Sequence, residues 1–182
     1  MKERKYKEDW VNETRFDAKG NEKRVPVYRG PLFSLPSGPE KRNLLLYSLL
    51  PWAALLALLL GWFGMDFPGT RVLYVFLPAG LILFPCLYWA MGIFAVLRAP
   101  QKMTRVQKET GIGRVLRSAA ACLILCCAAL LGECVFLLSG GNPGREWPGM
   151  LMLLAAAVLA SGTVARFRAV SRRLSEERSA GP

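Results

Sequence analysis

Four long apolar runs alternate with polar segments along the chain. They cover residues 44–63, 72–97, 115–138 and 150–165. A helix needs about 20 residues to cross the hydrocarbon core of a bilayer, and the first three runs reach that length. The fourth reaches it as a span over about 148–165, with the Arg166 side chain extending to the interface at its end. The pattern predicts an all-α integral membrane protein, a small bundle of four transmembrane helices over residues 44–165.

Residues 1–43 form a polar arm that is too short for a hydrophobic core of its own. Within it, two stretches rich in β-favouring residues flank a Gly-Asn pair, so residues 10–29 are expected to form a β-hairpin. A lone hairpin is only marginally stable, and Trp10, Phe16 and Tyr28 are large side chains to leave in water. These three side chains are therefore a candidate docking surface. The alternative is a loosely ordered, solvated arm.

The basic residues are distributed unevenly between alternate connections. Of the 24 Lys and Arg residues, 22 lie in residues 1–43, 98–117 and 166–182, and only Arg71 and Arg145 lie in the other two connections. Short cytoplasmic segments carry the excess of Lys and Arg in membrane proteins. Both termini and the middle loop are thus expected in the cytoplasm, with the protein in the plasma (inner) membrane. The basic tail from residue 166 is expected to fray beyond the last helix.

This topology also accounts for the net charge of +11. Basic segments beside a membrane are attracted to the anionic lipid headgroups of the inner leaflet. We therefore expect the lipid bilayer, with anionic headgroups at the cytoplasmic face, as a partner, and we do not expect nucleic-acid binding.

The composition argues against a metal or disulfide framework. The chain has five cysteines, all inside the apolar runs, and no histidine. An odd number of cysteines buried in lipid is not a disulfide pattern, and zinc sites commonly use histidine. Cysteine also packs as a small hydrophobic residue. No cofactor and no metal site are expected.

Small side chains recur on one face of three apolar runs. In the third run, one face carries a stripe, and in the fourth Ala156 and Ala160 share a face. Such faces let neighbouring helices approach closely. The first run has a similar ridge at Ala53, Ala57 and Gly61. The candidate packing face consists of Ala119, Cys122, Cys126, Ala129, Ala156 and Ala160.

Glu133 ends the stripe of small residues in the third run. It lies five residues before Leu138, hence about 7–8 Å along the helix from the end of the run. An acid inside a membrane is a candidate functional site. We expect it to be stabilised by Arg71 or Arg145, the two basic residues of that side, or to stay protonated. A structural or interfacial role is favoured over transport, because a carrier needs its acid accessible from both sides.

Aromatic residues at the ends of the runs indicate the depth of the bundle. Tryptophan and tyrosine concentrate where a membrane meets water. Trp62 and Trp147 are expected to mark the outer interface, and Tyr47 the inner one.

The sequence carries no catalytic motif that we recognise. It has no Walker-type glycine loop and no dinucleotide fingerprint, and without histidine it cannot hold a zinc-protease motif. We expect a non-enzymatic anchoring or accessory subunit that packs with a membrane-protein partner or with itself. The alternative is a small transporter or channel subunit that uses Glu133. A membrane enzyme is a third possibility.

Overall fold

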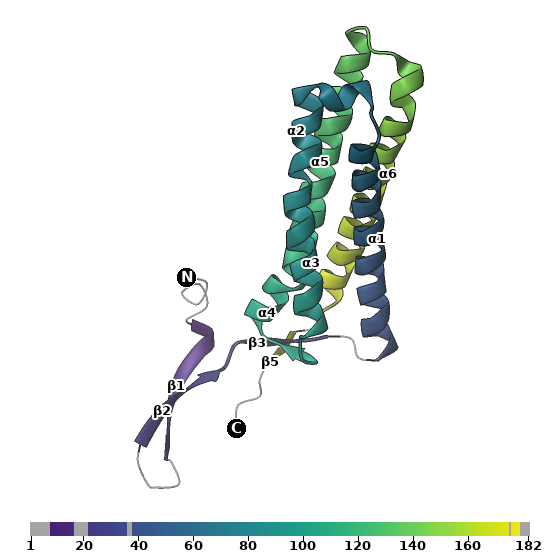
Figure 1. The fold of residues 1–182 in the computed structure, drawn as a ribbon. Coiled ribbons are helices and arrows are strands. Elements are labelled where there is room, and N and C mark those ends of the chain that lie inside the picture. The colour runs from purple at the N-terminus through teal and green to yellow at the C-terminus, as the bar shows by residue number, and fades with distance from the viewer. Residues whose placement is uncertain (1–7, 17–21, 36–37, 175, 179–182) are drawn as a thin grey trace.

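The computed structural model describes residues 8–16, 22–35, 38–174 and 176–178 (Figure 1). The chain is mostly helical, with a two-stranded hairpin and a three-stranded sheet. The long helices form a bundle, and four segments are long and apolar enough to cross a membrane. The expectation of four apolar helices is confirmed. The description "all-α" was incomplete, because it omitted the three-stranded sheet.

The first helix, α1, spans Pro39–Gly64 and starts earlier than its apolar run. Pro39 occupies the first helical position, where a proline loses no hydrogen bond. The second segment consists of α2 (Leu73–Leu81) and α3 (Leu83–Leu97), with a break at Ile82. Pro85 explains the break, because it has no N–H to donate to the carbonyl of Leu81.

The last two long helices are α5 (Ile112–Leu138) and α6 (Pro143–Arg173). Helix α6 extends beyond the expected fourth span at both ends, because it begins at Pro143 and continues well past Arg166. The side chain of Asn142 caps this helix by accepting a hydrogen bond from Gly144 N–H at 3.0 Å. An asparagine cap followed by proline is a strong signal for a helix start.

The bundle is apolar on its surface as well as in its core. Figure 1 shows α5 beside α6 and α2, with α1 running along α6. Many large hydrophobic side chains point outward, and Phe84, Leu87, Ile124 and Leu131 are each at least 65% exposed. Helices that are hydrophobic all round are typical of membrane spans. Lipid is the solvent that such a surface requires.

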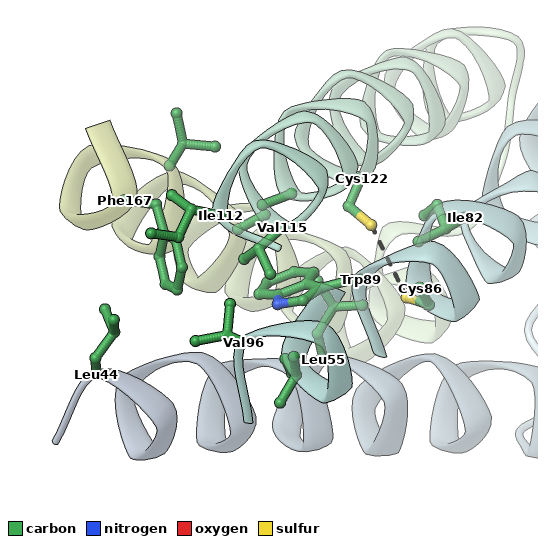
Figure 2. Close-up of a cluster of buried hydrophobic side chains, with 14 of the residues drawn as sticks. Leu44, Leu55, Ile82, Cys86, Trp89, Val96, Ile112, Val115, Cys122 and Phe167 are labelled. Carbon is green, nitrogen blue, oxygen red and sulfur yellow. Dashed lines mark hydrogen bonds between the residues drawn. The ribbon is translucent and has the colours of Figure 1, made fainter. Parts of the chain in front are cut away.

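Side chains from several helices meet inside the bundle (Figure 2). Two indole N–H groups find acceptors there: Trp89 donates to Ser48 Oγ at 3.1 Å, and Trp52 donates to the Cys86 carbonyl at 3.0 Å. Both bonds join α1 to α3. Polar contacts of this kind hold helices together where the hydrophobic effect is weak.

A three-stranded antiparallel sheet closes one end of the bundle. Its central strand β3 (Pro31–Ser34) lies between β4 (Lys102–Met103) and β5 (Glu176–Arg178). The short helix α4 (Arg105–Thr110) follows β4 and starts with a capping box between Thr104 and Gln107. We call β3, β4, β5 and α4 the platform, the end that carries it the platform end, and the opposite end the far end.

The platform joins three segments that lie far apart in the sequence. The linker before α1, the loop between α3 and α4, and the tail after α6 each supply one strand. Phe33 and Met103 are buried in the same core as Phe167 of α6 and Leu174. The expectation that the tail frays is wrong for Glu176–Arg178, which pair with β3.

The predicted hairpin is confirmed. Strand β1 (Trp10–Phe16) pairs with β2 (Glu22–Tyr28) in antiparallel register, with Trp10 opposite Tyr28. The expected Gly-Asn turn between the strands lies outside the described residues. Figure 1 shows the hairpin projecting sideways from the platform end, clear of the long helices.

Candidate functional site

Two acids meet beneath a short turn at the far end. The 3₁₀ turn η2 (Pro68–Arg71) connects α1 to α2. The N–H of Gly69 donates to Glu146 Oε1 at 2.9 Å. A Cβ atom on Gly69 would lie 2.6 Å from Glu133 Oε2. The carboxylates of α5 and α6 therefore both lie against the same glycine.

Both acids are completely buried, and three of their four oxygens are unpaired. Glu133 and Glu146 are each 0% exposed. Among the described residues, both oxygens of Glu133 and Oε2 of Glu146 have no hydrogen-bond partner. An unpaired polar group in an apolar interior costs about 1–3 kcal/mol, and a charged one costs more. This is the least satisfied polar cluster that we find in the described structure.

The expected pairing of Glu133 with arginine is wrong. Arg71 instead contacts Asp66, with 2.8 Å between Nη2 and Oδ2, and both side chains are about 70% exposed. Arg145 is exposed on α6, and no arginine bonds to either Glu133 oxygen within the described residues. The physical reason is the turn: it places Gly69 over Glu133, while Asp66 holds Arg71 in solvent.

Glu146 was not among the site residues expected from the sequence. The expected start of the fourth span, near residue 148, left this acid in a connecting loop. The signal was the Asn142–Pro143 pair, which predicts a helix start there. With α6 begun at Pro143, Glu146 falls near its first turn, where an acid interacts favourably with the helix dipole.

The candidate packing face is entirely inside the bundle. Its six residues are at most 1% exposed: Ala119, Cys122, Cys126, Ala129, Ala156 and Ala160. The stripe of α5 also meets the second segment, since Cys122 Sγ lies 3.9 Å from Cys86 Sγ of α3 (Figure 2). The other two cysteines of α5, Cys127 and Cys134, are exposed and lie away from the stripe of small residues. They do not form a site with Glu133.

Trp62 does not mark an interface. It is 0% exposed and packs with Phe67, Val75 and Leu153 in a core cluster at the far end. Its Nε1 has no hydrogen-bond partner in the described part of the chain, and a Cβ on Gly149 would lie 3.1 Å from this nitrogen. Trp147, in contrast, is 62% exposed, as a side chain at a membrane surface should be.

The residues of the expected docking surface have different environments. Trp10 is 46% exposed, and its ring contacts that of Tyr28 edge to face, with 5.2 Å between centroids. Tyr28 Oη donates to the Pro31 carbonyl at 3.1 Å and accepts from Arg105 N–H at 3.2 Å. Tyr28 thus fastens the hairpin to the platform. The side chain of Phe16 lies outside the described structure.

A hollow lies between α1 and α6 near the platform. It has a volume of about 340 Å³ and is lined by Tyr47, Arg166 and Arg173 among others. The guanidinium carbon of Arg166 lies 3.7 Å from the centre of the Tyr47 ring. The rest of the lining is mostly apolar, and it also includes the acid Glu40.

No group of three or more potential metal-ligating side chains occurs in the described residues. The Glu133–Glu146 pair offers two carboxylates and one backbone amide, and no histidine is present anywhere in the sequence. No known protein family, no curated protein and no solved structure matches this chain.

Proposed function

We propose that this protein is a non-enzymatic membrane anchor that presents a cytoplasmic docking surface to a protein partner. The observation that carries the proposal is the hairpin. It projects from the bundle, leaves Trp10 and Val11 more than 40% exposed, and is attached to the platform through Tyr28. Exposed aromatic side chains on a projecting element are typical of binding surfaces.

Contacts between the two ends of the hairpin brace its base. Arg29 N–H donates to the Asp9 carbonyl at 2.8 Å, and Arg29 Nη2 lies 2.8 Å from Glu13 Oε1. Gly30 lies so close to Asp9 and to Tyr28 Oη that a Cβ would be 2.6 Å from each side chain. A rigid attachment reduces the entropy lost when a partner binds.

A second surface for association lies within the membrane spans. Two residues of the small-residue ridge on α1, Ala53 and Ala57, are exposed, whereas Gly61 lies beside Met152 of α6. Ridges of this type let helices of separate chains approach closely. We propose that this face packs against a membrane-protein partner or a second copy of the chain.

The test of the anchor function is purification in mild detergent followed by native mass measurement. The expected mass exceeds that of one 20.1 kDa chain, through a second copy or a co-purifying protein. Ala57→Leu should weaken association across the α1 ridge more than Ala54→Leu, which adds the same side chain about 60° round the helix from Ala57. A stable monomer with no co-purifying protein would contradict the proposal.

The orientation of the bundle is part of the proposal. Because most basic residues lie in segments that join the platform end, we place that end in the cytoplasm. Reporters fused after Pro182 and within residues 140–144 should report opposite sides. A single side for both would overturn the four-span topology.

Anionic lipid is proposed as a further partner at the platform end. The hollow between α1 and α6 offers Arg166 and Arg173 beside an apolar wall. Binding of an anionic phospholipid, measured by native mass spectrometry, should fall in Arg173→Gln more than in Arg145→Gln, which changes an exposed arginine at the far end. Equal binding by both variants would remove this hollow as the lipid site.

A transporter or channel subunit is the second candidate function, and the buried acids favour it. Glu133 has two unpaired oxygens, and the break at Ile82 gives the second segment a hinge. In proteoliposomes, Glu133→Gln should reduce flux if this acid takes part. Undiminished flux in that variant would exclude Glu133 from transport.

A further inference from the structure

The far end contains a buried pair of acids, and no basic side chain of the described residues bonds to either of them. Glu133 of α5 and Glu146 of α6 both lie against Gly69 of the η2 turn. The nearby α1 segment has no titratable side chain between residues 52 and 64. The other titratable or charged side chains of this end are exposed: Asp66, Arg71, Tyr74, Cys134 and Arg145.

Two negative charges in this position would be strongly unfavourable. Neighbouring carboxylates in an apolar site do not both stay ionised, because like charges repel and burial removes their hydration. One proton removes half of the charge and turns one acceptor into a donor. The packing against Gly69 is tight, since even a Cβ there would lie 2.6 Å from Glu133 Oε2. A proton can neutralise one carboxylate here without requiring space beside Gly69.

The helix ends decide which acid holds the proton. Glu146 lies near the start of α6, at the positive end of the helix dipole, and accepts the Gly69 N–H. Glu133 lies near the end of α5, at the negative end of that dipole, and neither of its oxygens has a partner. Negative charge is therefore better placed on Glu146, and the proton on Glu133.

We propose that Glu133 and Glu146 form a binding site for a single proton, and that the bound proton keeps the η2 turn closed over the far end. When the proton is lost, both carboxylates are charged on either side of Gly69. Their repulsion and their need for hydration then favour movement of the η2 turn away from the two acids. This movement breaks the hydrogen bond from Gly69 N–H to Glu146. The closed form is expected at lower pH and is lost as the pH rises. The proposal does not depend on the anchor function or on which side of the membrane this end faces.

Infrared spectroscopy tests the proton directly on the wild-type protein. A buried protonated carboxylic acid gives a carbonyl band that is separate from the bands of ionised carboxylates. The band should be present at neutral pH, disappear on alkaline titration, and be missing in Glu133→Gln. If no such band is found in the folded wild-type protein, both acids are ionised and the proposal is overturned.

Hydrogen exchange tests the link to the turn. On raising the pH, protection of the amides of residues 69–72 should fall about tenfold in the wild type after correction for intrinsic exchange. Glu133→Gln is neutral at every pH and has nearly the same shape as the protonated acid, so its turn should stay protected. Asp66→Asn is the matched control, because it removes an exposed acid beside the same turn, and it should behave as the wild type does. Unchanged pH dependence in Glu133→Gln would overturn the link.

A metal cation is the competing occupant. Addition of Na⁺, K⁺ or Ca²⁺ at constant pH and ionic strength should leave the protection of residues 69–72 unchanged. Selective stabilisation of the wild type by one of these ions, absent in Glu133→Gln, would replace the proton with that ion and overturn the proposal.

Discussion

The two ends of the bundle treat polar groups in opposite ways. At the platform end, Tyr28 is partly exposed and is bonded to Pro31 and Arg105. At the far end, Glu133 and Glu146 are fully buried and mostly unpaired. Replacing an exposed polar side chain changes the free energy of unfolding little. A buried polar group without a hydrogen-bond partner lowers the free energy of unfolding substantially. This difference underlies our two proposals, a contact surface at the platform end and a single bound proton at the far end.

The largest effect is expected from Trp62→Ala at the far end. Trp62 fills the core cluster there, and truncation of a buried tryptophan costs about 3–5 kcal/mol of unfolding free energy. Trp147→Ala removes the same side chain from an exposed position of the same end and should cost far less. Denaturant unfolding in mild detergent measures both. Equal losses would show that Trp62 is not a core residue.

The next effect is expected from Gly69→Ala. The new methyl group would collide with the Glu133 carboxylate, and overpacking of a tight site costs about 1–3 kcal/mol. Gly64→Ala is the matched control, because a Cβ at Gly64 has open space around it. Thermal unfolding of the two variants in the same detergent gives the difference. If both variants unfold alike, the acids do not lie against the turn.

A smaller and local effect is expected from Tyr28→Phe at the platform end. The variant loses the hydrogen bonds to Pro31 and Arg105, and each such bond contributes about 0.5–1.5 kcal/mol. Amides of the hairpin should exchange faster, while those of α5 should not change. Acceleration in α5 would mean that the hairpin is part of the bundle's cooperative unit.

The smallest effect is expected from Asp66→Asn. Its pair with Arg71 is about 70% exposed, and exposed ion pairs contribute about 0–1 kcal/mol. The unfolding free energy should stay within that margin. A larger loss would indicate that this pair, and not the buried acids, holds the η2 turn.

The sequence was sufficient for the features that depend on local pattern. The apolar runs predicted the long helices, because a bilayer demands length and hydrophobicity from each span separately. Alternation around a Gly-Asn pair predicted the hairpin for the same local reason. The small-residue stripe through Cys122 was found from helical spacing alone, and the structure buries it in the bundle.

Contacts between distant segments could not be read from the sequence. The three strands of the platform come from residues about 70 positions apart or more, and no local signal links β3 to β4 or β5. Trp62 is a tryptophan at the end of an apolar run, which is typical of the membrane interface. Phe67 and Leu153 nevertheless pack around it and make it part of the core. The chemistry of a side chain determines in which environments the residue is stable. Which of these environments it occupies is determined by the residues that pack around it.

Glu133 shows most clearly which features depend on the sequence alone and which depend on the tertiary structure. Sequence spacing alone placed this acid on the inward face of its helix, because a helix turns by a constant angle per residue. Its partner was decided by tertiary structure: the early start of α6 brings Glu146 inward, and the η2 turn brings Gly69 in place of Arg71. A turn of four residues set that choice, since its backbone direction determines which side chain faces the bundle and which faces solvent.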